Sequence, residues 1–255
     1  MRSPMRLALL LMLLTAISGC AGTPPHQPGP FCALVHRGPA QDSGFEHPFL
    51  INDPWEGFNR RMYRFNAQLD RYVYLPVVRA YETAVPESVQ HGISNVFNNF
   101  KEIPIFFNAV LQGKGKKASI SLGRFLFNTS IGLGGLVDVL GAGGIPQENE
   151  DFGQTLGYWG VPAGPYLVLP VLGPSGLRDA GGTAVDALLA LNPADFAFDS
   201  MGWAARSAAS TSVYTLKAVD ARHQVKFRYY ETGSPFEYQL VRFLYTKKRE
   251  LDIAR

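Results

Sequence analysis

The sequence predicts a mostly α-helical fold, for three reasons. Apolar residues recur at helical spacing in several segments, and these segments begin and end at residues typical of helix termini. Alternating strand patterns with hairpin turns are scarce, and there is no internal repeat. Finally, 46% of the 255 residues are apolar and 18% are charged, a composition that excludes disorder over the whole chain.

The first predicted helix begins at Asp53-Pro54-Trp55-Glu56. An acidic capping residue, a proline and a glutamate stand there at the spacing typical of a helix start. Pro76 predicts the end of this helix or a kink in it. The apolar residues of the helix share one face and are Phe58, Met62, Phe65, Leu69 and Tyr72/Val73.

Further helices follow along the chain. The spacing of apolar residues predicts a second helix over 86–100 and a third over 103–112, with Gly113 as its stop. Downstream, 182–191 is predicted to be a short helix ended by Asn192-Pro193. Longer helical regions are expected at 204–230 and from 235 onward.

Two segments carry almost no charge. Residues 118–147 contain only Arg124 and Asp138, and residues 152–177 contain no charged residue but four prolines and six glycines. The second segment is therefore predicted to form no regular helix. Irregular apolar backbone lies at membrane depth only where it packs inside protein or lines a wet cavity. The alternative is a buried loop that crosses the core of a water-soluble domain, and the residues leave both open.

The first residues are predicted to be an export signal that occupies 1–19. Arg2 and Arg6 precede an apolar stretch at 7–14, whose eight residues fall far short of the roughly 20 that a spanning helix needs. Ile17-Ser18-Gly19-Cys20 resembles a bacterial lipobox, which predicts cleavage before Cys20 and acylation of that cysteine. An ordinary cleaved signal that happens to contain a cysteine is the alternative.

Residues 20–51 are predicted to be the acylated terminus and a flexible tether, because they are rich in Pro, Gly, His and Gln and lack periodicity. Acylation of Cys20 would leave Cys32 as a free thiol. Loss of two arginines with the signal lowers the formal net charge from +3 to +1, so a strongly basic nucleic-acid binder is excluded.

Catalytic and metal-binding motifs are incomplete. Gly173-Pro174-Ser175-Gly176-Leu177 has leucine where a nucleophile elbow needs glycine, and residues 132–137 lack the last glycine of a dinucleotide fingerprint. No histidines stand at ligand spacing, and two cysteines exclude a four-cysteine zinc site. The acidic residues Glu148, Glu150 and Asp151 are interpreted as a solvated turn. We therefore expect no enzyme activity, metal or cofactor.

Three motifs carry a resemblance to a known family: NDPWEGFNRRMYRFN (52–66), RFLFNTSIGLGGLVDV (124–139) and DFGQTLGYWGVPAGPYLVLPVLGPSGLRDAGG (151–182). In order and spacing they resemble the VacJ/MlaA family of outer-membrane lipoproteins. The resemblance implies a single ring-like helical domain over 52–250, embedded in one leaflet without a spanning helix, with a short tail at 251–255. It also implies an amphipathic channel through the ring.

The resemblance further implies a function. Such proteins remove mislocalised phospholipids from the outer leaflet of the outer membrane and pass them to a periplasmic carrier of the MlaC type. They lie in the periplasm-facing leaflet, anchored by lipid, where trimeric porins are their membrane partners. A structural or scaffolding lipoprotein that binds porins without moving lipid is the alternative.

Candidate residues follow from this resemblance. The glycine-rich stretch around Gly132, Gly134 and Gly135 is a candidate channel or gate element, and tight helix packing is the alternative. Arg124 and Asp138 are either a buried pair or polar groups of the channel. The candidate residues of the membrane-embedded wall are Trp159, Tyr166, Leu167 and Leu169.

Overall fold

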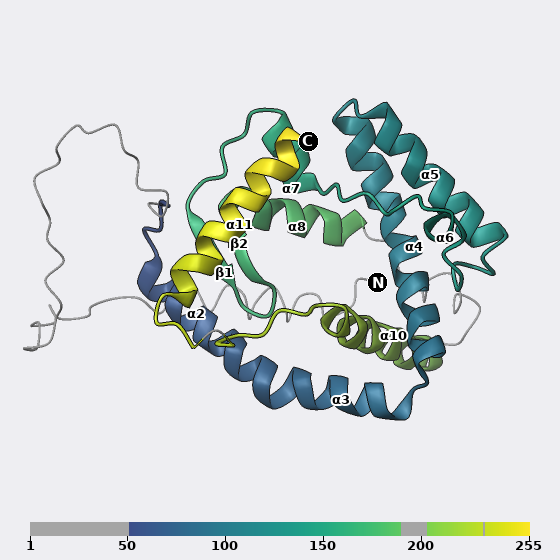
Figure 1. Ribbon diagram of the computed structural model, residues 1–255, viewed down its shortest axis with the longest axis horizontal. Helices are drawn as coiled ribbons and strands as arrows, with labels where there is room; N and C mark the ends of the chain where they lie inside the picture. Colours follow the sequence, from purple (N-terminus) through teal and green to yellow (C-terminus); the bar gives the residue numbers. More distant parts are fainter. Residues whose placement is uncertain (1–50, 190–202, 232) are drawn as a thin grey trace, which may run out of the picture. The chain divides into compact units, whose positions relative to one another are not determined.

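A computed structural model describes residues 51–189, 203–231 and 233–255, all of them within one compact unit, Glu46–Arg255. These residues are mostly helical, which confirms the predicted fold class (Figure 1). None of the helices in the described ranges is both long enough and apolar enough to cross a bilayer. The predicted signal peptide, Cys20 and most of the tether lie outside the described residues.

The first helical stretch continues through Pro76. It consists of α2 (Glu56–Leu69), the π-helical turn η1 (Asp70–Tyr74) and α3 (Leu75–Ala84). Proline lacks the N–H of a regular helix, and its ring needs room beside the carbonyl four residues earlier. The wider π turn immediately before Pro76 provides that room. Of the two outcomes predicted at Pro76, the end of the helix was therefore wrong, and the kink stays a prediction.

One long helix replaces the second and third predicted helices. α4 (Glu87–Leu111) carries Pro104 in its interior, and Gly113, with φ +70°, follows its C-terminus as predicted. α5 (Gly115–Ser130) packs along α4, and the short α6 (Val139–Ala142) follows it (Figure 1).

The uncharged segment 152–177 contains regular structure that the sequence did not predict. α7 (Phe152–Tyr158) is a seven-residue helix whose N-cap, Asp151, accepts a hydrogen bond from the Gln154 amide at 2.8 Å. β1 (Tyr166–Leu169) and β2 (Gly173–Gly176) then form an antiparallel hairpin in which Leu169 pairs with Gly173.

Three helices complete the described fold. α8 (Leu177–Leu189) begins five residues before the predicted start, and its predicted end at Asn192-Pro193 lies outside the described residues. α11 (Glu237–Ala254) lies where a helix was predicted, whereas α10 (Trp203–His223) ends seven residues before the predicted end at 230. Residues 251–254, which were expected to be a tail, belong to α11.

Contacts between these elements close a circuit. η1 joins α2 to α3, and α3 contacts α10, which in turn contacts α4. From α4 the contacts continue to α7 and then to α11. The circuit closes at the β hairpin, on which both α11 and α2 pack. Asp53, ahead of α2, accepts hydrogen bonds from Tyr238 at 2.5 Å and Arg242 at 2.8 Å on α11. The beginning and the end of the described chain are thus fastened together.

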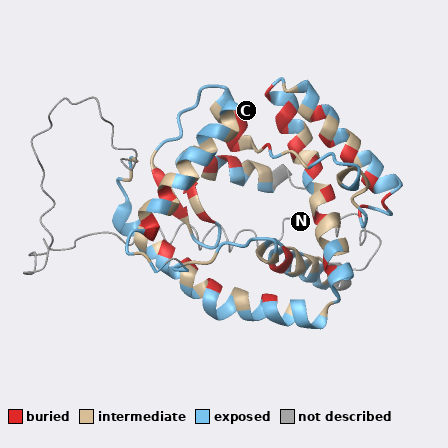
Figure 2. Ribbon diagram, viewed as in Figure 1, coloured by how far each residue is buried: buried red, intermediate tan, exposed pale blue. Residues whose placement is uncertain are grey.

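The buried face of the first helical stretch is polar. Asn59, Tyr63, Asn66 and Asp70 repeat at helical spacing and are each at most 4% exposed. The predicted apolar face of the same stretch is exposed at Phe58 and Phe65, 47% and 45%, whereas its Met62 packs against the apolar core. Figure 2 shows how buried and exposed residues divide the helices lengthwise.

α4 and α5 repeat this inversion. Their buried polar residues are Gln90, Asn99, Glu102, Asn108, Ser121, Arg124 and Asn128. Their exposed apolar residues include Phe107, Val110, Leu111, Leu122, Leu126 and Phe127. Buried charges and large exposed apolar surfaces are each unusual in water-soluble proteins. A smaller apolar core exists where Tyr63 packs with Tyr166, Val168 and Tyr238.

Candidate functional site

Arg124 and Asp138 form an ion pair, with Asp138 Oδ2 accepting from Arg124 Nη2 at 2.8 Å. Arg124 lies on α5 and is only 3% exposed. Its Nε donates to Glu102 Oε1 on α4 at 2.5 Å, and its Nη1 donates to the carbonyl of Ile145. The structure therefore brings the two predicted charges together and adds Glu102, which the sequence analysis missed. Its only signal was a lone carboxylate among the apolar residues of α4.

The surroundings of the two carboxylates affect them in opposite directions. Burial raises the pKa of Glu102, although its hydrogen bonds with Arg124 and Gln147 oppose this shift. Burial alone would also raise the pKa of Asp138, but hydrogen bonds from Arg124, the Gly141 amide and Asn128 hold that pKa below its usual range. Asp138 is thus a fixed anion, whereas Glu102 depends on Arg124 for its charge.

Asp138 and Asn128 fix the two ends of the glycine-rich turn. Asn128 Nδ2 donates to Asp138 Oδ1 at 2.9 Å, and its Oδ1 accepts from the Leu140 amide at 3.3 Å. Asp138 also caps α6 by accepting from the Gly141 amide at 2.9 Å. Since Asn128 belongs to α5, the polar network connects α4, α5 and α6 beneath the turn.

The three candidate glycines differ in the reason why the fold needs a glycine at each position. A Cβ at Gly132 would lie 2.3 Å from the Val137 carbonyl oxygen, and one at Gly135, where φ is +93°, would lie 2.8 Å from Asn99 Nδ2. Gly134 has φ +73° but nothing within 4 Å of its Cβ position. Close packing therefore requires Gly132 and Gly135, and only the backbone conformation requires Gly134.

Apolar side chains cover the outside of this turn. Leu133 is 71% exposed and Ile131 is 63% exposed, and Leu136 and Val137 are exposed as well. This surface continues onto α5 through Phe127. A buried charged network thus lies beneath a solvent-facing apolar cap, the reverse of the arrangement that water favours.

The four candidate wall residues have different environments. Trp159 is exposed, and its indole N–H donates to the Leu111 carbonyl at 3.1 Å. Leu167 and Leu169 are half-buried. Tyr166 lies in the apolar core, where its ring meets that of Tyr238 edge-on. Its side chain therefore faces protein, and we no longer assign it to a lipid-facing wall.

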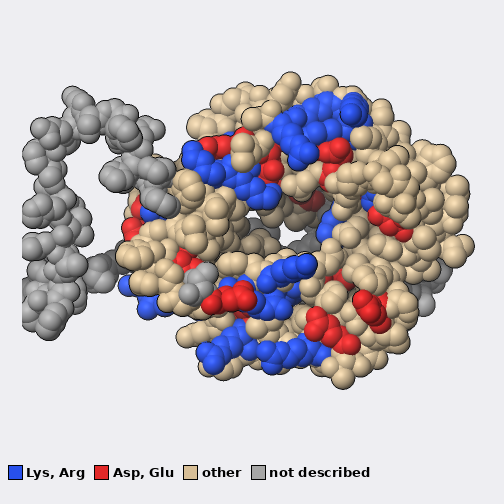
Figure 3. Space-filling model, viewed as in Figure 1, with Lys and Arg blue, Asp and Glu red and all other residues tan. Residues whose placement is uncertain are grey.

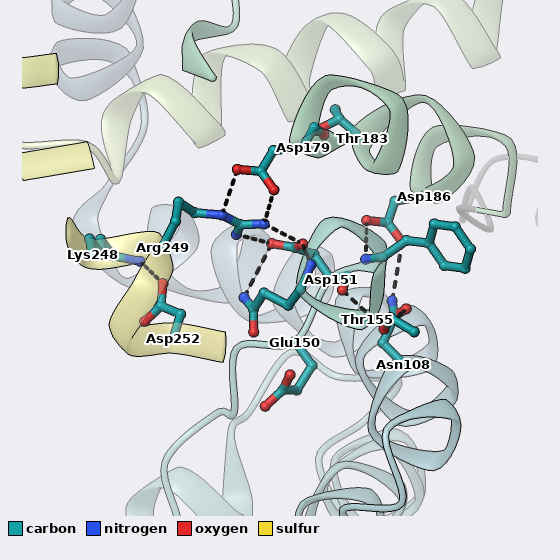
Figure 4. Close-up of polar contacts among 12 residues, drawn as sticks. Asn108, Glu150, Asp151, Thr155, Asp179, Thr183, Asp186, Lys248, Arg249 and Asp252 are labelled. Carbon is teal, nitrogen blue, oxygen red and sulfur yellow. Dashed lines mark hydrogen bonds and ion pairs between the residues drawn. The ribbon is translucent and has the colours of Figure 1, made fainter. Parts of the chain in front are cut away.

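A second buried network joins α7, α8 and α11 (Figure 4). Arg249 Nη1 donates to Asp151 Oδ2 at 2.5 Å, and its Nη2 and Nε donate to the two Asp179 oxygens at 2.9 and 3.0 Å. Glu150, 3% exposed, pairs with Lys117 at 2.5 Å and also with Lys114. The interpretation of this acidic turn as solvated was therefore wrong for Glu150, whereas the Asp151 side chain pairs with Arg249 and is still 36% exposed.

Fold and site together define a class of protein: a mostly helical chain with charged networks inside, apolar side chains outside, and no spanning helix in the described ranges. The chain belongs to the MlaA lipoprotein family, whose profile matches residues 51–252. In the part of the chain that the structure describes, no cluster of His, Cys, Asp and Glu could hold a metal ion.

Similar proteins include the "intermembrane phospholipid transport system lipoprotein MlaA" of Shigella flexneri, 36% identical over 72% of this chain, and that of Escherichia coli K12, 36% identical over 71%. The match spans 66% of each relative, just under two thirds of its length. The Haemophilus influenzae protein of the same name is 37% identical over 61% of this chain and 63% of its own length.

A solved structure described as the structural basis for maintenance of bacterial outer membrane lipid asymmetry is also similar. It has a TM-score of 0.61 and 32% sequence identity, and the match covers 79% of this chain and 98% of the other. This agreement supports the fold and the family together.

Proposed function

We propose that this protein is an outer-membrane lipoprotein that removes mislocalised phospholipids from the outer leaflet and passes them to a periplasmic lipid carrier. Its activity would maintain the lipid asymmetry of the outer membrane. The names of the relatives, which refer to intermembrane phospholipid transport, support this proposal. In this role the chain moves lipid without chemical reaction, cofactor or metal.

The inverted polarity of the helices is the observation that carries the proposal. Exposed side chains such as Phe127, Leu133 and Trp159 would lie among acyl chains, where burial stabilises each large apolar side chain by about 1.5–3 kcal/mol relative to exposure in water. The buried face of α2, with Asn59 and Asn66, supplies polar groups on the opposite side. Such a protein suits one leaflet of a bilayer without spanning it.

The closed circuit of contacts supports a ring in the periplasm-facing leaflet, with an amphipathic channel inside it. Acylation of Cys20 would anchor the ring, because several acyl chains hold a protein durably on a membrane. Trimeric porins would hold it laterally, and a carrier of the MlaC type would receive the lipid. Trp159, Leu167 and Leu169 remain candidates for the wall.

The glycine-rich turn is the proposed gate. In this structure the turn is held by hydrogen bonds from the Gly134 amide to the Thr129 carbonyl at 2.9 Å and from the Gly135 amide to the Asn128 carbonyl at 2.8 Å. Gly134, whose φ is +73°, has no atom within 4 Å of its Cβ position, and a glycine changes φ at little steric cost. Arg124 and Asp138 would hold the base of the turn in place while its apolar tip moves.

Mass spectrometry of the protein purified from membranes, both intact and after solvent extraction, tests the proposal. We expect a triacylated Cys20 terminus and extractable phospholipid. Gly134→Val, in a protein that still assembles, should abolish the removal of outer-leaflet phospholipid, with Gly57→Val on the exposed side of α2 as control.

Three other results would count against the proposal. An acylated Cys20 terminus without specifically bound phospholipid would favour a scaffolding lipoprotein. A chain without acylation at Cys20 would contradict the proposed lipid anchor. Unchanged lipid asymmetry in the assembled Gly134→Val variant would refute the gate.

A further inference from the structure

A groove lined by arginines lies beside the first helical stretch, outside the polar networks described above. It has a volume of about 610 Å³ and is bounded by α2, η1, α3 and residues 228–230. Its four arginines are Arg64, Arg71, Arg79 and Arg228. Figure 3 shows Lys and Arg side chains gathered along the lower edge of the unit, where Figure 1 places α2 and α3.

These four guanidinium groups have no carboxylate partner among the described residues. The carboxylate that lines the groove, Asp70, is already held by Arg222, which donates to its two oxygens at 2.5 and 2.8 Å. Arg228 donates only to backbone carbonyls, among them that of Val225 at 3.2 Å. The groove therefore presents an excess of positive charge with free hydrogen-bond donors.

The buried arginines of this protein are different. Arg124 and Arg249 are each shared between two carboxylates, and Arg242 pairs with Asp53. An anion could bind any of them only by displacing a carboxylate. The groove is thus a place where arginine donors are available to a ligand.

Less polar side chains border the same groove. Tyr72 lines it and is 69% exposed, with the Arg71 guanidinium 5.7 Å from the centre of its ring. Leu75, which is half-buried, lines it as well. Tyrosine beside basic residues is typical of the boundary between lipid head groups and acyl chains.

We propose that this groove binds the phosphate of a phospholipid head group, with Tyr72 and Leu75 against the glycerol and upper acyl region. Planar guanidinium groups match phosphate oxygens in a bidentate geometry. Four arginines also favour an anionic head group such as phosphatidylglycerol over phosphatidylethanolamine, whose ammonium the groove repels. The inference rests on the proposed function, because it assumes that this surface meets lipid.

Binding to the full-length acylated protein in a non-ionic detergent tests the inference. The probes are short-chain phosphatidylglycerol below its micelle concentration, short-chain phosphatidylethanolamine, the corresponding diacylglycerol without phosphate, and inorganic phosphate. The variant Arg71→Gln/Arg79→Gln removes two exposed groove charges. Lys116→Gln/Lys247→Gln removes two exposed charges on α5 and α11, outside the groove, and is the matched control.

The groove variant should bind phosphatidylglycerol at least about tenfold more weakly, because it loses charge-assisted hydrogen bonds to the phosphate. The control should stay within about twofold of the unmodified protein, since its charges lie on α5 and α11 and do not line the groove. Tyr72→Ser should weaken binding of the short-chain lipid but leave binding of inorganic phosphate unchanged. All four replaced residues are exposed, so thermal unfolding should not change.

Each contrary result has a distinct meaning. Equal weakening of lipid binding in the groove and control variants would show that binding depends on net charge. That result would refute the groove as the binding site. Inorganic phosphate that binds as tightly as the lipid would overturn the lipid head group as ligand. Unchanged lipid binding in the groove variant would place the lipid elsewhere and leave the proposed function standing, whereas absence of all phospholipid binding in the unmodified protein would count against both.

Discussion

Replacing Arg124 with methionine removes the guanidinium that Glu102 and Asp138 share. Glu102 is fully buried, so the variant leaves a carboxylate without its counter-charge inside the protein. Removal of one partner from a buried ion pair destabilises a protein by about 3–5 kcal/mol. We expect a loss of that size in the free energy of unfolding at pH 8, measured by denaturant titration in detergent with tryptophan fluorescence.

The loss should shrink as the pH falls. Burial already raises the pKa of Glu102, and removal of Arg124 raises it further because the attraction that opposes the shift is gone. An acid whose pKa is higher in the folded state binds more protons there, so folding stability rises as the pH falls through that pKa. The variant should therefore be closer to the unmodified protein at pH 5 than at pH 8.

A matched set of variants isolates the ion pair. Arg124→Met/Glu102→Met replaces both partners with apolar side chains and should recover most of the lost stability. Arg61→Met, on the exposed side of α2, should change stability by less than about 0.5 kcal/mol. If Arg124→Met unfolded like the unmodified protein at both pH values, the network would not stabilise the fold and the reasoning would fail.

Three further predictions concern the turn, the second network and the apolar cap. Gly132→Ala should lower the melting temperature more than Gly134→Ala, because only the first clashes with backbone while the second costs about 1–2 kcal/mol of backbone strain; equal effects would contradict the described geometry. Arg249 holds the pKa values of Asp151 and Asp179 below their usual range, although burial alone would raise them. Folding stability should therefore fall as the pH drops through the folded-state pKa values of these aspartates. Arg249→Met should flatten this pH dependence in a series of unfolding titrations. In a Cys32→Ser background in nanodiscs, brominated acyl chains should quench a fluorophore attached at Leu133→Cys but not one attached at Lys116→Cys. Equal quenching at the two positions would argue against a lipid-facing cap.

Helical periodicity identified most helices but not the side of each that faces inward. The spacing of Phe58 and Phe65 is the same whether the apolar face of the helix contacts a protein core or lipid. Hydrophobic periodicity shows only that the two faces of a helix differ in polarity, and it does not show what surrounds each face. The inward face of Asn59 and Asn66 became visible only when both side chains were seen to hydrogen-bond to the β hairpin.

Prolines and short strands account for the other differences. Pro76 and Pro104 would end helices in an isolated chain, yet neither does here, where π-helical geometry and packing compensate for the missing donor. The hairpin was missed because β2 reads GPSG, four residues with weak strand preference that pair only in the context of β1.

The candidate site was predicted in part. Arg124 and Asp138 were identified as isolated charges in an apolar stretch, which is a signal in the sequence itself. Glu102 stands 22 residues before Arg124 on another helix, and Arg249 lies 98 residues after Asp151. Pairings of this kind depend on the tertiary fold, and a single sequence does not encode them as a local pattern.

The hydrogen bonds between Asp53 and α11 affect the order in which the chain folds. Tyr238 and Arg242, 185 and 189 residues further along the chain, supply the bonds that hold the start of α2. Contacts this distant form late in folding, since closure of a long loop precedes any gain from them. A chain that lacks α11 lacks these bonds, so the circuit can close only after the last helix has been made.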